Sequence, residues 1–153
     1  MARLRLLLAT CLVAGAIGVP AGPTRLQAGA QAAEIVSPVP PGLEGTWRWV
    51  GFSSGKERMT IGTPDSYTLE FPAGDRIALK ADCNRAAGSV TFGEAGAIKI
   101  GPMAMTRAMC PPGSLSDRFA QAVERATHWS IHDGALLLEQ PADLGTLRFL
   151  HAP

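Results

Sequence analysis

The sequence predicts an α+β domain with a small antiparallel, strongly curved or barrel-like sheet of about seven short strands and one packed helix. Most of the chain after residue 42 alternates apolar and polar residues in short runs, which is typical of half-buried strands. Short Gly-, Pro- and Asp-containing turns separate these runs, so neighbouring strands should pair antiparallel. Only one segment has helical periodicity, and a single helix can cover one face or end of such a sheet.

Residues 1–32 are predicted to be a cleaved signal peptide. Arg3 and Arg5 give a positive start, and the apolar run that follows over residues 6–19 is too short to span a bilayer as a helix. Two cleavage sites with small residues are available, one ending at residue 21 and one ending at residue 32. We favour the later site because Ala- and Gln-rich sequence continues up to it, and the alternative is a retained N-terminal anchor.

Cys11 lies inside this signal and is interpreted as an ordinary apolar residue of it. A lipoprotein cysteine follows a small residue at the end of a full apolar core, whereas Cys11 follows Thr10 after only a few apolar residues. The expected location is therefore periplasmic or secreted, without a lipid anchor and without a membrane span after signal cleavage.

Residues 33–42 are predicted to be a proline-rich linker, and residues 43–151 form one domain. From Ala33 onward the chain has 11 Lys and Arg and 13 Asp and Glu residues, a formal charge of −2. No basic stripe interleaved with aromatic residues is present, so the sequence does not indicate nucleic-acid binding.

The expected strands follow one another with recognisable turns. A loop is expected over residues 53–64, a turn at residues 72–75, another at residues 93–96, and a tight hairpin at Asp133-Gly134. The alternating runs are residues 46–50, 67–71, 76–80, 88–92, 97–100, 129–132, 135–140 and 146–151.

The helix is expected over residues 114–127. One apolar stripe at helical spacing carries the prediction, with Phe119 as its main anchor. Its members are Leu115, Phe119, Ala122, Val123 and Ala126. Ser114 lies three residues before Asp117, which resembles a capping box, and Pro111-Pro112-Gly113 ends the preceding element.

Cys83 and Cys110 are the only cysteines outside the signal, and we predict that they form a disulfide. In an oxidising compartment two thiols pair by default, and a small domain gains stability from the constraint. The first cysteine lies in Asp82-Cys83-Asn84-Arg85 at the end of a strand. The second ends a run from Met103 to Cys110 that leads into the helix.

These two motifs, together with Leu43-Glu44-Gly45-Thr46-Trp47, resemble the META domain of the HslJ family over residues 43–150. The resemblance implies an exported, β-rich domain linked to heat shock, novobiocin tolerance or parasite virulence, with no established catalytic residues. Family members often have Gly before the first cysteine, where this chain has Asp82. The motif residues Asp82, Asn84, Arg85, Met103, Met105, Thr106 and Arg107 are predicted to be structural.

Arg85 and Arg107 are the best candidates for a polar site, and we predict that both are clamps at the two cysteine-bearing turns. A guanidinium has five donors in a fixed fork, so it can bind several carbonyls or a carboxylate such as Asp82. A functional role for the two arginines is the alternative.

Two sets of residues could bind a metal ion. Met103, Met105, Met109 and Cys110 are soft ligands of the kind that Cu(I) prefers. However, methionine is a common core filler, and a disulfide would remove the thiolate. His128 and His132 lie four apart in a segment that reads as a strand, and His151 lies far along the chain. No metal and no cofactor are predicted.

No Gly-x-Ser-x-Gly elbow, phosphate-loop lysine or dinucleotide spacing is present, so an enzyme is not the leading hypothesis. We predict a non-enzymatic envelope domain that binds an unknown protein or small-molecule ligand in a stress- or antibiotic-tolerance role. The alternatives are a hydrolase with an unrecognised site and a metal-handling protein. The sequence leaves the oligomeric state open.

Overall fold

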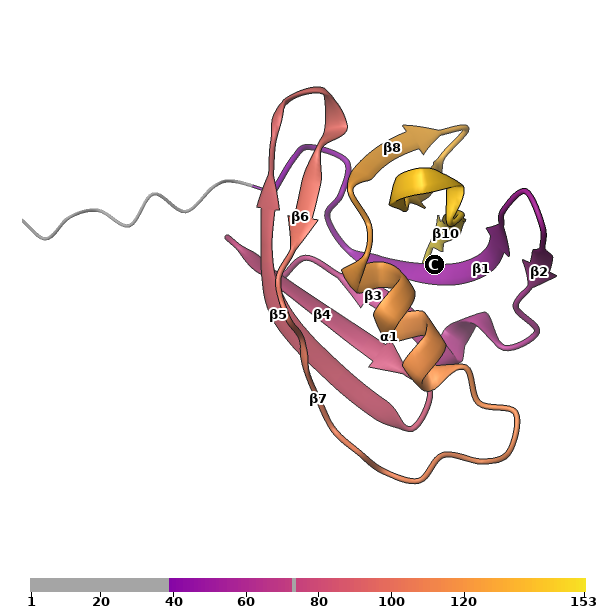
Figure 1. Cartoon of the computed structure of the whole chain (residues 1–153). Helices are drawn as coiled ribbons and strands as arrows, with labels where there is room; N and C mark the ends of the chain where they lie inside the picture. Colours follow the sequence, from indigo (N-terminus) through magenta and orange to yellow (C-terminus); the bar gives the residue numbers. More distant parts are fainter. Residues whose placement is uncertain (1–38, 73) are drawn as a thin grey trace, which may run out of the picture. The chain divides into compact units, whose positions relative to one another are not determined.

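A computed structural model describes residues 39–72 and 74–153, and in this part of the chain ten strands surround a single α-helix (Figure 1). In chain order the strands and the helix are β1 (Thr46–Ser53), β2 (Arg58–Thr60), β3 (Tyr67–Glu70), β4 (Arg76–Ala81), β5 (Asn84–Phe92), β6 (Ile98–Ile100), β7 (Ala104–Met105), α1 (Ser116–Glu124), β8 (His128–His132), β9 (Ala135–Glu139) and β10 (Thr146–His151). Three short 3-10 helices lie at Pro64–Ser66, Glu94–Gly96 and Pro141–Asp143.

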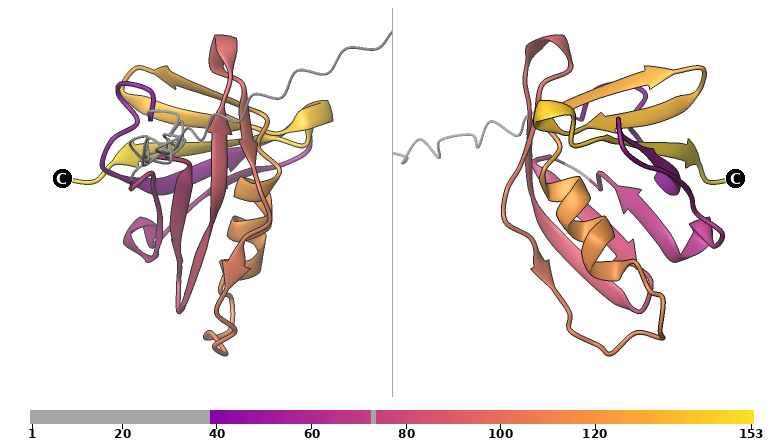
Figure 2. Two further views of the ribbon diagram at one scale, coloured as in Figure 1. Left: turned by 90° about the vertical axis from the view of Figure 1, so that its left-hand side faces the viewer. Right: turned by 45° about the vertical axis from the view of Figure 1, so that its right-hand side comes forward.

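The strands form one strongly curved antiparallel sheet in the order β6-β5-β4-β3-β1-β10-β9-β8 (Figure 2). The short strands β2 and β7 pair with β1 and β5, outside this path. The two ends of the path meet where Ala97 forms a bridge with His128 and the Ile98 amide donates to the Thr127 carbonyl at 3.1 Å. This contact makes the sheet a nearly closed barrel, and the predicted fold class is confirmed.

The prediction of about seven strands was too low, because very short strands have no readable alternation. β2 spans three residues inside the segment that was expected to be a loop, and β7 spans only two. Each is defined by pairing with a long neighbour, Gly51 to Ser53 for β2 and Ala86 to Ala87 for β7. Such pairing depends on tertiary contact and not on a local pattern.

The expected tight turn between β8 and β9 is present. At the β8–β9 hairpin, Asp133 and Gly134 have φ of 49° and 72°, and His132 pairs with Ala135 across them. Two consecutive positive φ values are typical of a type I′ turn, whose twist matches that of the strands. The expected Asp-Gly hairpin is therefore confirmed.

Helix α1 is shorter than predicted. It begins at Ser116 and ends at Glu124, and its N-cap residue is Leu115 without a side-chain cap. The Ser114 hydroxyl accepts the Ser116 amide at 3.3 Å, so Ser114 orders the residues before the helix and forms no capping box. In the described residues no helix is long and apolar enough to cross a membrane.

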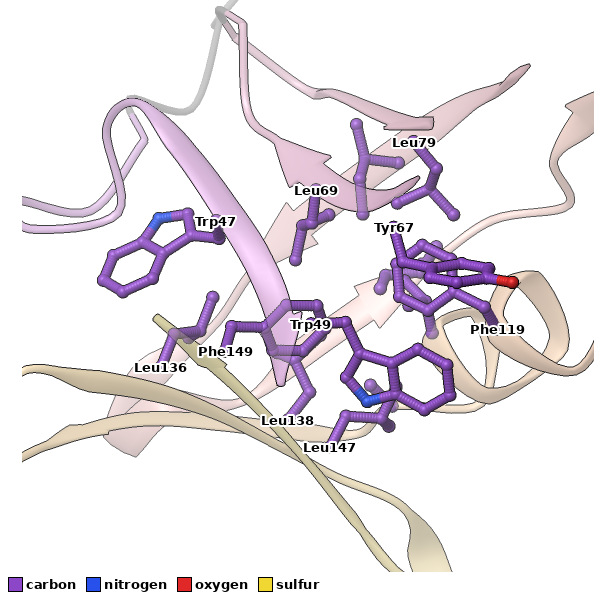
Figure 3. Packing of buried hydrophobic residues seen from close by; sticks show 14 of the residues in the cluster. Trp47, Trp49, Tyr67, Leu69, Leu79, Phe119, Leu136, Leu138, Leu147 and Phe149 are labelled. Atoms are coloured by element: carbon purple, nitrogen blue, oxygen red, sulfur yellow. The ribbon is translucent and has the colours of Figure 1, made fainter. Parts of the chain in front are cut away.

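The apolar stripe of α1 packs on the inner side of the sheet, as predicted. Phe119 and Val123 have no exposed surface. The Phe119 ring stacks on Trp49 with centroids 5.0 Å apart and meets Tyr67 edge-on at 5.7 Å (Figure 3). Since Trp47 is buried as well, the two tryptophans of β1 share the core face. At the opposite end of the core, Trp129 is partly buried and packs against Phe92.

The predicted signal peptide of residues 1–32 lies outside the described residues. Of the predicted linker, only residues 39–42 are described. They contain a turn in which the Leu43 amide donates to the Pro40 carbonyl at 3.1 Å. Leu43 is fully buried, and Val39 before it packs partly buried against the core.

Candidate functional site

The turn between β4 and β5 starts the candidate site. Ala81 pairs with Asn84, so Asp82 and Cys83 form a two-residue turn. Asp82 has a φ of 58°, in the left-handed region that costs a residue with a Cβ atom more than glycine. The geometry explains why glycine suits this position in the family that the motif resembles. Aspartate is among the side chains that tolerate the same conformation best.

The Asn84 side chain is the centre of the site and is only 4% exposed. Its Oδ1 accepts the Ala108 amide at 2.8 Å and the Thr106 hydroxyl at 2.9 Å. Its Nδ2 lies 3.2 Å from each of three acceptors: the Ala108 carbonyl, the Ser116 hydroxyl and the Cys110 sulfur. One buried amide therefore joins the end of a strand, the loop after β7 and the start of α1.

Thr106 makes further hydrogen bonds between β5 and the loop after β7. Its hydroxyl oxygen accepts the Arg85 amide at 3.0 Å, and its own amide donates to the Arg85 carbonyl at 2.9 Å. These bonds extend the β5–β7 pairing by one residue beyond Met105. The order of β7 and of the residues after it thus depends on side chains of the two cysteine motifs.

Cys83 and Cys110 form the predicted disulfide, with their Cα atoms 5.4 Å apart. The bond joins the β4–β5 turn to the chain that approaches α1, as the sequence predicted. Residues 106–113, which we call the braced loop, are therefore held by a covalent bond and by Asn84.

The braced loop presents one large apolar side chain to solvent. Met109 is 99% exposed, although its neighbours Ala108 and Cys110 are both fixed by contacts with the first motif. An isolated exposed apolar residue is ordinary on a protein surface. Here, however, the backbone on both sides of Met109 is restrained, so its position is set before any partner binds.

A cleft of about 550 Å³ lies beside Met109, between the braced loop and the first turn of α1. Asn84 and Ser116 line its inner side, and Arg107, Asp117 and Arg118 line its polar rim. Arg107 and Asp117 form an ion pair at 3.4 Å in which both side chains are largely exposed. Such a pair contributes at most about 1 kcal/mol and can rearrange around a ligand.

The two arginines of the motifs lie in different surroundings. Arg107 pairs with Asp117 of α1 and not with Asp82. Among the described residues the Arg85 guanidinium makes no hydrogen bond or ion pair, and the contact at this position comes from its backbone amide and carbonyl. At this position β5 is therefore held to the loop by Thr106 and the Arg85 main chain. This differs from the prediction that the Arg85 side chain is a clamp.

The methionines do not share one environment. Met103 and Met105 are partly buried against the core, whereas Met109 is in solvent. Cys110 is in a disulfide and offers no thiolate. No group of three His, Cys, Asp or Glu side chains that could hold a metal ion occurs within the described residues.

The histidines lie apart from this site. His128 and His132 are on β8, as their sequence context predicted, and His132 lies 2.9 Å from Asp133. His151 packs edge-on against Trp47 with centroids 4.7 Å apart. In the described part of the chain no hydrogen bond joins a histidine to a serine hydroxyl, a contact that a serine nucleophile uses.

Sequence reasoning missed Ser116 and the exposure of Met109. Ser116 is buried as the acceptor for Asn84, although its position in the sequence suggested only the start of a helix. The tyrosine that supports this corner, Tyr67, was seen only as a strand residue. Its hydroxyl accepts the Leu115 amide at 2.9 Å and so satisfies one amide that precedes α1.

Comparison with known proteins supports the family that the motifs indicated. The META domain family model matches residues 41–153. No curated protein sequence matches the chain significantly. Neither the family description nor the structural matches below name an enzymatic activity.

Solved structures with the same fold are distant in sequence. A DUF4847 family protein from Bacteroides vulgatus is 14% identical with a TM-score of 0.55, and the match covers 73% of this chain and 95% of that one. A protein from Burkholderia xenovorans, solved by NMR, is 18% identical with a TM-score of 0.57, over 72% of this chain and 83% of that one. At these identities the matches show a shared fold.

Proposed function

The chain belongs to the META domain family, and we propose that it is an exported, non-enzymatic domain that binds another envelope protein through the braced loop and Met109. The observation that carries this proposal is the 99% exposure of Met109 on a backbone held by Asn84 and the disulfide. A side chain that is already in place costs less conformational entropy to bind than one on a mobile loop.

The chemistry around Met109 suits a protein surface. An exposed thioether adapts to irregular apolar pockets, and methionine is enriched in interfaces. Arg107 and Asp117 on the adjacent rim offer one donor group and one acceptor group to polar atoms around such a pocket. The expected contact is therefore a small apolar centre with a polar rim.

The predicted export signal supports an envelope partner. The N-terminal sequence has the features of a signal peptide, and the Cys83–Cys110 disulfide is compatible with an oxidising compartment. The HslJ-like assignment, with its role in stress or novobiocin tolerance, is part of the same proposal and rests on the motif resemblance.

Site-specific photo-crosslinking tests the proposal. A photoreactive phenylalanine analogue replaces Met109 in cells, and a matched control places it at Ala95, which is exposed in the turn between β5 and β6. We expect a discrete protein adduct at position 109 that Asn84→Ala abolishes, because that variant releases the loop. Identical adducts from both positions, or no adduct at position 109, would refute a binding site there.

A functional assay complements the crosslink. In a strain that lacks the gene, Met109→Asp should fail to restore tolerance to heat or novobiocin, whereas Ala95→Asp should restore it. Both proteins should melt like the parent, since both side chains are exposed. Full complementation by Met109→Asp would contradict the proposal.

A further inference from the structure

Positive charge concentrates around the β1–β2 hairpin, although the chain from Ala33 onward has a formal charge of −2. Three open clefts adjoin there, and each pair of them has lining residues in common: Ser54 and Gln140 for one pair, Phe52 for the second, and Ser53 and Arg58 for the third. Together they are lined by five cations: Lys56, Arg58, Arg118, Arg125 and Arg148. The only described carboxylates in the same lining are Glu57 and Glu139, so this surface is positive.

The cleft between the hairpin and α1 has a volume of about 480 Å³, within the range of small-molecule sites. Apolar atoms of Phe52, Ala122 and Leu144 line it, and Leu144 is 51% exposed. The Phe52 ring is fixed between the Gly145 backbone and the Arg118 guanidinium, whose central carbon lies 5.3 Å from the ring centroid. The apolar wall of the cleft is therefore already formed.

One of the cations in this cleft is neutralised. Arg118 donates to Glu57 at 2.6 Å. The hydrogen bond from Arg118 is the main reason that the pKa of the Glu57 carboxyl lies below its usual value; desolvation opposes this lowering, and the positive charge of Arg118 adds to it. Glu57 stays ionised at neutral pH and compensates Arg118. Lys56 and Arg125 line the same cleft and form no ion pair with any described side chain.

We propose that this cleft binds a single amphiphilic anion, with the charged head between Lys56 and Arg125 and the apolar part against Phe52 and Leu144. Two cations that pair with no described side chain, beside an apolar wall, match a carboxylate, phosphate or sulfate joined to an acyl or similar chain. The site is separate from the braced loop, so it stands independently of the proposed protein partner.

Titration with monomeric dodecanoate, below its micelle concentration and followed by amide chemical shifts, tests this site. We expect saturable shifts at Phe52, Arg125 and Leu144. Lys56→Gln and Arg125→Gln should each weaken binding about two- to fivefold, as expected for loss of one exposed charge pair, and the double variant about tenfold. Leu144→Ser should weaken the binding of dodecanoate and leave the weaker binding of inorganic phosphate unchanged.

Lys99→Gln is the matched control, because it removes one exposed cation on β6 that lines none of the three clefts. It should bind dodecanoate like the parent. An equal loss in Lys99→Gln and Arg125→Gln would mean only a general charge effect and would overturn the site. Sedimentation with phosphatidylglycerol vesicles, without binding of monomeric dodecanoate, would also overturn it, since a membrane surface would then be the ligand.

Discussion

Helix α1 and the braced loop that precedes it are held in place by different physical means. The helix is fixed by apolar burial, with Phe119 against Trp49, Tyr67 and Phe149. The braced loop contributes no fully buried apolar side chain and is fixed by the Asn84 amide, the Thr106 hydroxyl and a disulfide.

The stability of the domain and the position of the braced loop therefore depend on different interactions. Apolar burial scales with area and tolerates many side chains of similar volume. A buried amide with donors and acceptors in fixed directions specifies one loop conformation. Substitutions in the core should therefore reduce stability, whereas substitutions in the polar network should chiefly release the loop.

The largest effect is expected for Phe119→Ala. Its ring has no exposed surface and makes three aromatic contacts, so truncation should lower the free energy of unfolding by about 3–5 kcal/mol. Chemical denaturation measures the change, and Phe119→Leu is a control that should cost less. A loss below about 1 kcal/mol would mean that α1 does not anchor the core.

The disulfide should come next. The bond closes a sequence separation of 27 residues, and replacing Cys83 and Cys110 together by serine should cost about 3–4 kcal/mol. The same denaturation experiment, on the double variant and on the parent, gives the value. Peptide mapping of the native protein without reductant should give one linked pair, and two alkylated thiols would contradict the disulfide.

Asn84→Ala should cost about 2 kcal/mol, because it leaves the buried Ser116 hydroxyl and the Ala108 amide without their partner. Asn84→Asp keeps the acceptor but loses Nδ2, so it should fall between alanine and the parent. If both variants unfold like the parent protein, the polar network is irrelevant to the fold, and the disulfide alone braces the loop.

Asp82→Gly should have the smallest effect and the opposite sign. Glycine relieves the left-handed conformation at φ 58°, and its greater freedom in the unfolded chain offsets part of the gain. We expect stabilisation of about 0.5 kcal/mol in thermal unfolding. Thr91→Gly, at an exposed position within β5, is the control and should destabilise. Destabilisation by Asp82→Gly would mean that the aspartate side chain has a role of its own.

The sequence predicts the parts of the fold that depend on periodicity. The alternating runs, the Asp133-Gly134 turn, the buried faces of β1 and α1, and the Phe119 anchor all follow from local spacing. It does not predict β2 or β7, because these are set by pairing with Gly51 and Ala86 across space, and it places the start of α1 two residues too early, since Ser114 accepts the Ser116 amide before the helix and is not its cap.

The site was predictable only in part. The two cysteines that follow the predicted signal peptide predict the disulfide, and the motif resemblance draws attention to Asn84 and Thr106. The Asn84 side chain acts through Ala108 and Ser116, which lie 24 and 32 residues after it in the chain. No local pattern encodes these contacts, nor does one encode the cleft that Lys56 and Arg125 both line.

Backbone ¹⁵N relaxation of the braced loop tests the central claim most directly. If Asn84 and the disulfide preset the position of Met109, the order parameters of Ala108 and Met109 in the free protein should be about 0.85, as in rigid strands. The Asn84→Ala variant should lower both values while β4 and α1 keep theirs. Order parameters below about 0.6 in the parent protein would show a mobile loop and contradict the account.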